Sequence, residues 1–233
     1  MNLLAIDTAT EACSAAVHCD GKVSSRFEIV GRDHTQRLLP VVQAAMTEAG
    51  LRYADLDGIV CGVGPGSFAG VRIAVAFAKG AAFAHDLPVV GVSSLAMLAQ
   101  AAISEQGASA VLAAVDARMG EVYWGCYLSR QGIAVPLQPE VVCPPHAVSV
   151  VTAQPRWHAA GTGWGVYPAE LAAAADEPVF CDGKALPNAL HALTLALPSF
   201  ESGEAFSPDA LAPTYLRNQV ALTLVQQAAL RGR

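Results

Sequence analysis

Charged residues are scarce in this sequence: Asp, Glu, Lys and Arg make up 15% of its 233 residues, against 53% apolar residues. That charged fraction lies well below the average of soluble domains, so little charge is available to cover the surface. We therefore expect some apolar surface that a partner covers. The net charge of −6 argues against broad nucleic-acid binding, which needs clustered Lys and Arg, and leaves a local basic patch open.

Long hydrophobic runs, a basic leader and paired cysteines are also missing. No segment reaches the roughly 18 uninterrupted apolar residues of a membrane helix, and residues 1–7 meet an acid without a preceding basic region. These features predict a cytoplasmic protein with no membrane association. The six cysteines form no Cys-x-x-Cys pair, and Cys13, Cys61 and Cys126 lie inside apolar runs, where a buried thiol is the simplest interpretation. We expect no zinc site.

The first 105 residues alternate short apolar runs with amphipathic segments. Asp20-Gly21 separates two β-prone runs and is typical of a tight hairpin. The apolar patterns predict strands over 3–6, 13–18, 23–29, 56–63 and 88–92, and helices over 35–49, 68–85 and 94–103. Because a hairpin meander is followed by alternating helices and strands, we expect a mixed sheet covered by helices.

A weak copy of this pattern begins near residue 106. The apolar run 111–117 ends around Asp116 as the run 3–9 ends around Asp7, and a second run follows in each copy. A Gly turn then leads to a third run, at Gly21 in the first copy and Gly132 in the second. The sequence therefore predicts an α/β protein built from two βββαβα units, with lobes at residues 1–105 and 106–233.

The strongest local motif is Gly64-Pro65-Gly66-Ser67, between a predicted strand and a predicted helix. Gly64 and Gly66 permit a tight turn or a close approach of the backbone, and Ser67 is placed to cap the helix. Backbone N–H groups at such a helix start can also bind an anion. Neither a Walker lysine nor the GxGxxG spacing is present, which favours the structural role and leaves phosphate binding as the alternative.

Two carboxylates each end an apolar run at the start of a lobe. Asp7 and Asp116 could hold Mg²⁺ through water in a nucleotide cleft, or could simply cap the adjacent turns. With Gly64, Gly66 and Ser67 they are the candidate cofactor-binding residues, although we expect no resident cofactor. The six histidines include no i, i+4 pair, so no metal ligands and no catalytic residue can be assigned.

The predicted helix 68–85 is apolar around most of its circumference. From residue 70 to residue 84 its only charges are Arg72 and Lys79, and small residues surround the rest. Such a helix should be buried nearly all round, either by another helix of the lobe or by another chain. With the helix 35–49 it supplies our candidate interface residues: Leu38, Val42, Ala45, Gly70, Ala74, Phe77, Ala78 and Ala81.

These residues resemble the TsaB (YeaZ) family of bacterial tRNA threonylcarbamoyladenosine biosynthesis proteins. The resemblance rests on the glycine turn with its continuation through Ile73, and on Ala5-Ile6-Asp7-Thr8-Ala9. It continues in segments 34–40, 116–123 and 213–217, so it spans nearly the whole chain. One departure is Ala69, where the family usually has Thr, and its missing hydroxyl weakens the case for a ligand there.

The resemblance implies the two-lobed actin-like, sugar-kinase and Hsp70 fold. It also implies a non-catalytic paralogue of TsaD, because the His-x-x-x-His pair of TsaD-like proteins would fall near Ser94 and Leu98, where no metal could be held. The expected role is an accessory subunit that pairs with a TsaD-like subunit. With a TsaE-like ATPase, the pair would support threonylcarbamoyl transfer to adenosine 37 of tRNAs reading codons that start with A.

Homodimers that use the same helical face are also implied, with tRNA contacted only indirectly. Two alternatives stay open. An independent ATP-dependent phosphotransferase of the same fold would use Asp7, Asp116 and the glycine turn. A glycoprotease is the least favoured, since the sequence offers neither a metal-ligand pair nor an assignable nucleophile.

Overall fold

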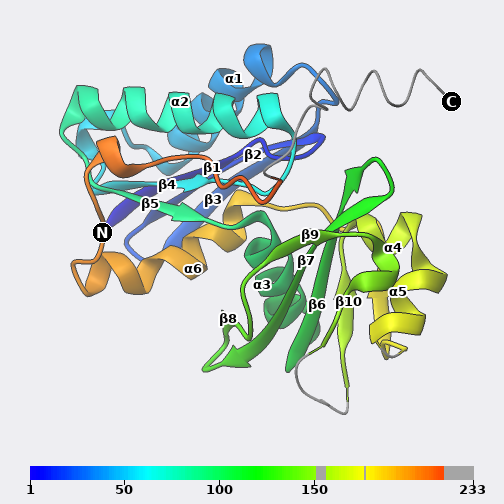
Figure 1. Ribbon diagram of the computed structural model, residues 1–233. Helices are drawn as coiled ribbons and strands as arrows, with labels where there is room; N and C mark the ends of the chain where they lie inside the picture. Colours follow the sequence, from blue (N-terminus) through cyan, green and yellow to red (C-terminus); the bar gives the residue numbers. More distant parts are fainter. Residues whose placement is uncertain (151–155, 176, 218–233) are drawn as a thin grey trace, which may run out of the picture.

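The computed structural model describes residues 1–150, 156–175 and 177–217. Two β-sheets with flanking helices lie one above the other in Figure 1, and the chain passes from the first sheet to the second through one helix. The first sheet contains β1 (Asn2–Asp7), β2 (Ala12–Cys19), β3 (Lys22–Ile29), β4 (Gly58–Gly62) and β5 (Val89–Val92), in the order β3-β2-β1-β4-β5. This is the mixed sheet that the sequence predicts.

Local turn chemistry sets the shape of the first lobe. The predicted hairpin is confirmed: β2 and β3 pair antiparallel, and both Asp20 and Gly21 have positive φ, at 48° and 80°. β1 pairs antiparallel with β2 and parallel with β4. The strand predicted over 56–63 is shorter, because the N–H of Leu56 closes a 3-10 turn, η1 (Tyr53–Asp55), by bonding to the Tyr53 carbonyl.

Helices cover both faces of the first sheet. Helices α1 (His34–Ala49) and α2 (Phe68–His85) lie on one face, and α6 (Ala189–Glu201) lies on the other (Figure 1). Side chains of β1 alternate between them: Leu4 and Ile6 join the core under α1 and α2, whereas Leu3 and Ala5 join the core over α6. Both faces of β1 are therefore shielded from solvent, which explains its unbroken apolar run.

The second sheet repeats the connectivity of the first. Its strands β6 (Ala110–Arg118), β7 (Glu121–Arg130), β8 (Ile133–Pro136), β10 (His158–Ala160) and β11 (Phe180–Asp182) lie in the order β11-β10-β6-β7-β8. In each sheet the first strand of the copy lies between an antiparallel second strand and a later parallel strand, β4 in the first sheet and β10 in the second, so the predicted duplication is confirmed. The second copy has β9 (Val141–Cys143), paired with β7, and η2 (Pro145–Ala147) where the first has α1. Two short helices follow β10, namely α4 (Thr162–Val166) and α5 (Pro168–Ala175).

Two helices pack on the sheet of the opposite lobe. Helix α3 (Ser94–Gln106) follows β5 but lies against the second sheet, where Leu98 and Ala102 share a core with Val111. Helix α6 follows β11 but packs on the first sheet. The two helices contact each other, and His191 Nε2 lies 3.1 Å from Glu105 Oε1. A boundary at residues 105 and 106 therefore separates the two sheets. It does not separate each sheet from the helices that cover it, because α3 and α6 each pack on the sheet of the other lobe.

Burial agrees with the compositional predictions. Cys13, Cys61 and Cys126 are fully buried, as predicted, and all six cysteines are free thiols. Within the described residues, no helix is both long and apolar enough to cross a membrane. A short 3-10 helix, η3 (Pro208–Ala210), follows α6 and leads into a segment that returns to the space between the lobes.

Candidate functional site

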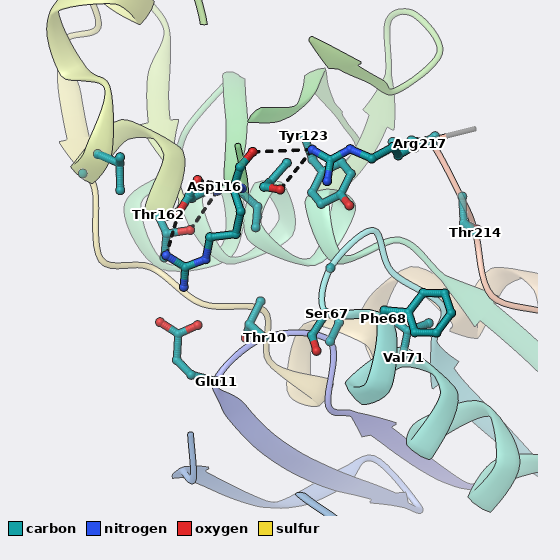
Figure 2. A pocket seen from close by; sticks show the side chains of 18 of the residues that line it. Thr10, Glu11, Ser67, Phe68, Val71, Asp116, Tyr123, Thr162, Thr214 and Arg217 are labelled. Carbon is teal, nitrogen blue, oxygen red and sulfur yellow. Dashed lines mark hydrogen bonds and ion pairs between the residues drawn. The ribbon is translucent and has the colours of Figure 1, made fainter. Parts of the chain in front are cut away.

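A cleft of about 770 Å³ lies between the two lobes. The first lobe contributes the β1–β2 turn, the glycine turn and Arg32, while the second contributes the end of β6, Thr162 and Lys184. In Figure 2, Thr10, Glu11 and Ser67 lie across the cleft from Asp116 and Thr162. This volume is in the range of small-molecule sites.

The glycine turn brings α2 against the β1–β2 turn. Ser67 caps the helix as predicted, since its Oγ accepts the Gly70 N–H at 3.3 Å, and its own N–H donates to the Ala9 carbonyl at 2.6 Å. A Cβ at Gly66 would lie 2.2 Å from the Ala9 carbonyl oxygen, and one at Gly70 would lie 2.0 Å from the Thr8 carbonyl oxygen. Close packing thus accounts for these glycines. Gly66 and Ser67 line the cleft, Gly64 does not, and phosphate binding there stays a prediction.

Asp7 lies beneath the cleft and does not line it. Its side chain is fully buried, with Oδ1 accepting the Ala9 N–H at 3.2 Å and Oδ2 lacking any hydrogen-bond partner among the described residues. Burial raises the pKa of this carboxyl to about 6, because the charged form loses its hydration. The two predicted carboxylates are therefore not brought together on the cleft wall.

Asp116 does line the cleft, but its carboxylate is already engaged. It accepts the Arg118 N–H at 2.9 Å and pairs with the Arg118 guanidinium at 3.0 Å. The Asp116 N–H donates to Thr162 Oγ1 at 3.1 Å. Its side chain is 9% exposed, whereas that of Arg118 is 84% exposed, so the guanidinium is the group presented to a ligand. This geometry favours the turn-capping role of Asp116.

Residues 213–217 form a strap that joins the lobes across the cleft. At one end the Thr214 N–H donates to the Val63 carbonyl of the first lobe at 2.8 Å. At the other end Arg217 Nη2 donates to Glu121 Oε2 at 2.5 Å and to the Ala117 carbonyl at 3.1 Å. Figure 2 shows Thr214 and Arg217 on this segment, on the side of the cleft next to Phe68. The sequence drew attention to the strap only through the family resemblance.

Several cleft residues were missed by sequence reasoning: Thr10, Glu11, Arg32, Thr162 and Lys184. Each stands in a loop or at the start of an element, where no periodic pattern marks it. Their proximity depends on how the two lobes pack, which a single sequence does not reveal.

The family resemblance places the two histidines of TsaD-like proteins near Ser94 and Leu98, at the start of α3. Ser94 and Leu98 are both fully buried, and Ser94 Oγ has no hydrogen-bond partner among the described residues. The preceding Ser93 caps the helix by accepting the Leu95 N–H at 3.1 Å. Within the described ranges, no group of three or more His, Cys, Asp and Glu side chains is arranged to hold a metal.

Most of the candidate interface residues face the interior of the chain itself. Six of them are buried in α1 and α2: Leu38, Val42, Ala45, Gly70, Ala74 and Ala78. All except Gly70 belong to the first-lobe core. Phe77 and Ala81 are partly exposed. Within the described residues, α2 keeps an outer face with Phe68 at 60% and Phe83 at 56% exposure, so the covering of this face by another chain stays a prediction. A partner on this side would meet the outer face, since the inner face is used against the sheet.

The duplicated sheets, the exchanged helices and the interlobe cleft define this chain as a two-lobed protein of the actin-like, sugar-kinase and Hsp70 fold class. Residues 27–173 match the family model for TsaD, tRNA N6-adenosine threonylcarbamoyltransferase. The chain is 44% identical to the tRNA threonylcarbamoyladenosine biosynthesis protein TsaB of Escherichia coli, over 95% of this chain and 96% of that protein. It therefore belongs to the TsaB family.

Other relatives agree with this membership. The TsaB protein of Haemophilus influenzae is 36% identical over 94% of this chain and 95% of its own length. The structure of YeaZ from Pseudomonas aeruginosa superposes with a TM-score of 0.88 at 46% identity, covering 92% of this chain and 99% of that one. The family resemblance and the fold predicted from the sequence are thereby confirmed.

Proposed function

We propose that this chain is a non-catalytic accessory subunit in the synthesis of N6-threonylcarbamoyladenosine in tRNA, and that it acts by pairing with a TsaD-like subunit. Its TsaB relatives are named for this biosynthesis. The observation that carries the proposal is that Ser94 and Leu98, at the start of α3, are fully buried. The family resemblance places the histidine pair of TsaD-like proteins near these two positions. Neither side chain offers an imidazole to a metal or to substrate.

The outer face of α2 supports the pairing part of the proposal. Phe77 is partly exposed and Phe83 is 56% exposed, while Ala76, Gly80 and Ala84 between and beside them are small and exposed. Small residues permit a close approach of another helix, and exposed aromatic rings supply the apolar area that such a contact buries. The same face could serve a homodimer, and a TsaE-like ATPase would join the larger complex.

Gly80 gives a sharp test of this surface. A Cβ at Gly80 would meet no atom within 4 Å, so a side chain fits there without disturbing the fold. In Gly80→Arg a charge is placed in the middle of the contact, and we expect at least tenfold weaker binding to the TsaD-like subunit in calorimetric titration. Gly80→Ala is the matched control and should bind as the unmodified chain does. Equal binding by both variants would remove this face from the proposal, and no association of the unmodified chain would remove the proposal itself.

The alternative of an ATP-dependent phosphotransferase finds less support in the geometry. Asp7 is sealed beneath the cleft, and Asp116 is paired with Arg118. A Mg²⁺-dependent transfer would need at least one of these carboxylates to be open to the cleft. Titration of the purified chain with ATP and Mg²⁺ tests this point, and tight binding with turnover would favour the phosphotransferase.

A further inference from the structure

The cleft concentrates positive charge on a chain that is acidic overall. The whole sequence has 14 Lys and Arg against 20 Asp and Glu, whereas the cleft wall has four cations and two acids. Those cations are Arg32, Arg118, Lys184 and Arg217. The sequence left a local basic patch open, and the fold assembles one from both lobes.

Two of these cations have no acidic partner among the residues that the structure describes. Arg32 comes from the first lobe and Lys184 from the second, both are exposed, and neither side chain forms an ion pair or hydrogen bond within the described ranges. Arg118 neutralises Asp116 but remains 84% exposed itself. The cleft wall thus presents ammonium and guanidinium groups from opposite sides, an arrangement suited to an anionic ligand.

Aromatic rings lie beside this charge at the mouth of the cleft. Phe68 is 60% exposed and Tyr215 is 49% exposed, and their ring centroids are 6.2 Å apart. The Arg72 guanidinium carbon lies 3.2 Å from the Phe68 centroid and 4.9 Å from the Tyr215 centroid. The two rings are tilted by 32° to each other, and the guanidinium lies against both. Exposed aromatic rings and guanidinium groups are the kind of surface on which unstacked nucleic-acid bases stack.

We propose that the mouth of the cleft, with Phe68, Arg72 and Tyr215 as a stacking platform and Arg32, Arg118 and Lys184 as phosphate contacts, binds a single-stranded segment of RNA directly. The choice of RNA as the polymer rests on the proposed role in tRNA modification. Direct contact goes beyond the indirect role that the sequence predicts. It requires no metal ion, because the side chains themselves neutralise the phosphates.

Fluorescence anisotropy with the full chain and a labelled 17-nucleotide anticodon stem-loop RNA tests the proposal. We expect saturable binding at low salt, with the logarithm of the association constant falling against the logarithm of salt concentration at a slope between about −1.5 and −3, for two to four single-strand phosphates. Arg32→Gln with Lys184→Gln should reduce the slope by about 1.4. Lys22→Gln with Arg130→Gln is the matched control, because it removes the same charge from exposed positions outside the cleft and should change neither slope nor affinity.

Phe68→Ala separates stacking from charge. It should weaken RNA binding about tenfold and leave the salt slope unchanged, because a ring is lost but no cation. Three results would each overturn the proposal: no binding at 25 mM salt, equal weakening by the matched control, or equal affinity for a fully paired RNA duplex. Displacement of the RNA by ATP at lower concentration than by unlabelled RNA would instead assign the cleft to free nucleotides, and would also overturn it.

Failure of this inference can be told apart from failure of the proposed function. A chain that pairs with the TsaD-like subunit but ignores RNA keeps its accessory role and loses the RNA site. A chain that binds RNA at the cleft but does not pair with the TsaD-like subunit keeps the RNA site and loses the proposed accessory role. If Phe68→Ala weakens pairing while RNA binding is unchanged, the platform belongs to a protein interface and the RNA proposal falls.

Discussion

Asp7 and Gly62 lie so close on neighbouring strands that a Cβ on Gly62 would be 1.9 Å from Asp7 Oδ2. The contact joins the ends of β1 and β4 beneath the interlobe cleft. Only a glycine at position 62 leaves room for the buried carboxyl, which cannot move away because the core surrounds it.

Gly62→Ala should therefore destabilise the protein by several kcal/mol, because the added methyl overlaps a buried polar group. Gly80→Ala is a useful comparison, since it adds the same atom to an open helix surface and should stabilise the protein by up to about 1 kcal/mol. Urea denaturation of the two variants measures both changes. Similar midpoints for the two would show that the collision at position 62 is easily relieved.

Burial raises the pKa of Asp7 to about 6, which predicts the direction in which the stability of the folded chain changes with pH. Below about pH 4 the carboxyl is protonated in both the folded and the unfolded chain. Between about pH 4 and 6 the folded chain holds a proton that the unfolded chain has lost, so the contribution of Asp7 to stability falls as pH rises. Above pH 6 a penalty on the order of 2–3 kcal/mol remains.

Asp7→Asn removes this titration while keeping the acceptor for the Ala9 N–H. Its stability relative to the unmodified chain should therefore rise by about 2–3 kcal/mol between pH 4 and pH 7.5. Chemical denaturation at the two pH values gives the difference directly. A gap that does not change with pH would mean that Asp7 titrates normally.

The hydroxyls of Ser93 and Tyr127 both donate hydrogen bonds to the same carboxylate oxygen of Glu140. Tyr127 is 1% exposed, so Glu140→Ala would leave its hydroxyl buried without an acceptor, at a loss of about 1–3 kcal/mol. Adding Tyr127→Phe to that variant should recover part of the loss, because the orphaned hydroxyl is gone. Thermal unfolding of the single and double variants checks the coupling, and purely additive losses would contradict it.

Loss of the Arg217 guanidinium should loosen the strap. The Arg217 and Glu121 side chains are 19% and 32% exposed, so we expect Arg217→Gln to cost only about 1 kcal/mol of stability. The larger change should be local: the Thr214 amide, bonded to Val63, should exchange its hydrogen faster once the far end of the strap is free. Hydrogen-exchange mass spectrometry measures it, with Arg130→Gln as the control and unchanged exchange as the contrary result.

Features set by neighbouring residues could be predicted from the sequence. The helix over 68–85 was predicted with its observed ends, because a Ser cap and the glycine turn mark its start. The hairpin at Asp20-Gly21 and the end of α1 at Gly50 follow from the same local chemistry. The repeated run around Asp116 was enough to reveal the duplication.

Features set by packing between distant segments could not be predicted in the same way. No signal in the sequence near Asp7 shows whether its side chain lies on the cleft wall or in the sealed core. The inner and outer faces of α2 are both rich in alanine, so the sequence did not distinguish core residues such as Ala74 and Ala78 from residues that a partner would cover. The strap, Arg32 and Lys184 come together at one cleft only because the two lobes pack against each other.

The exchange of α3 and α6 has a consequence for how this protein is made. The first sheet is complete once residue 92 has been synthesised, yet the helix that covers its second face ends at residue 201. An apolar face that includes Leu3, Ala5 and Val60 must therefore wait, uncovered, while more than a hundred further residues leave the ribosome. Each half of the chain therefore needs a helix from the other half to cover its sheet. Neither half, cut at residue 105, should fold by itself.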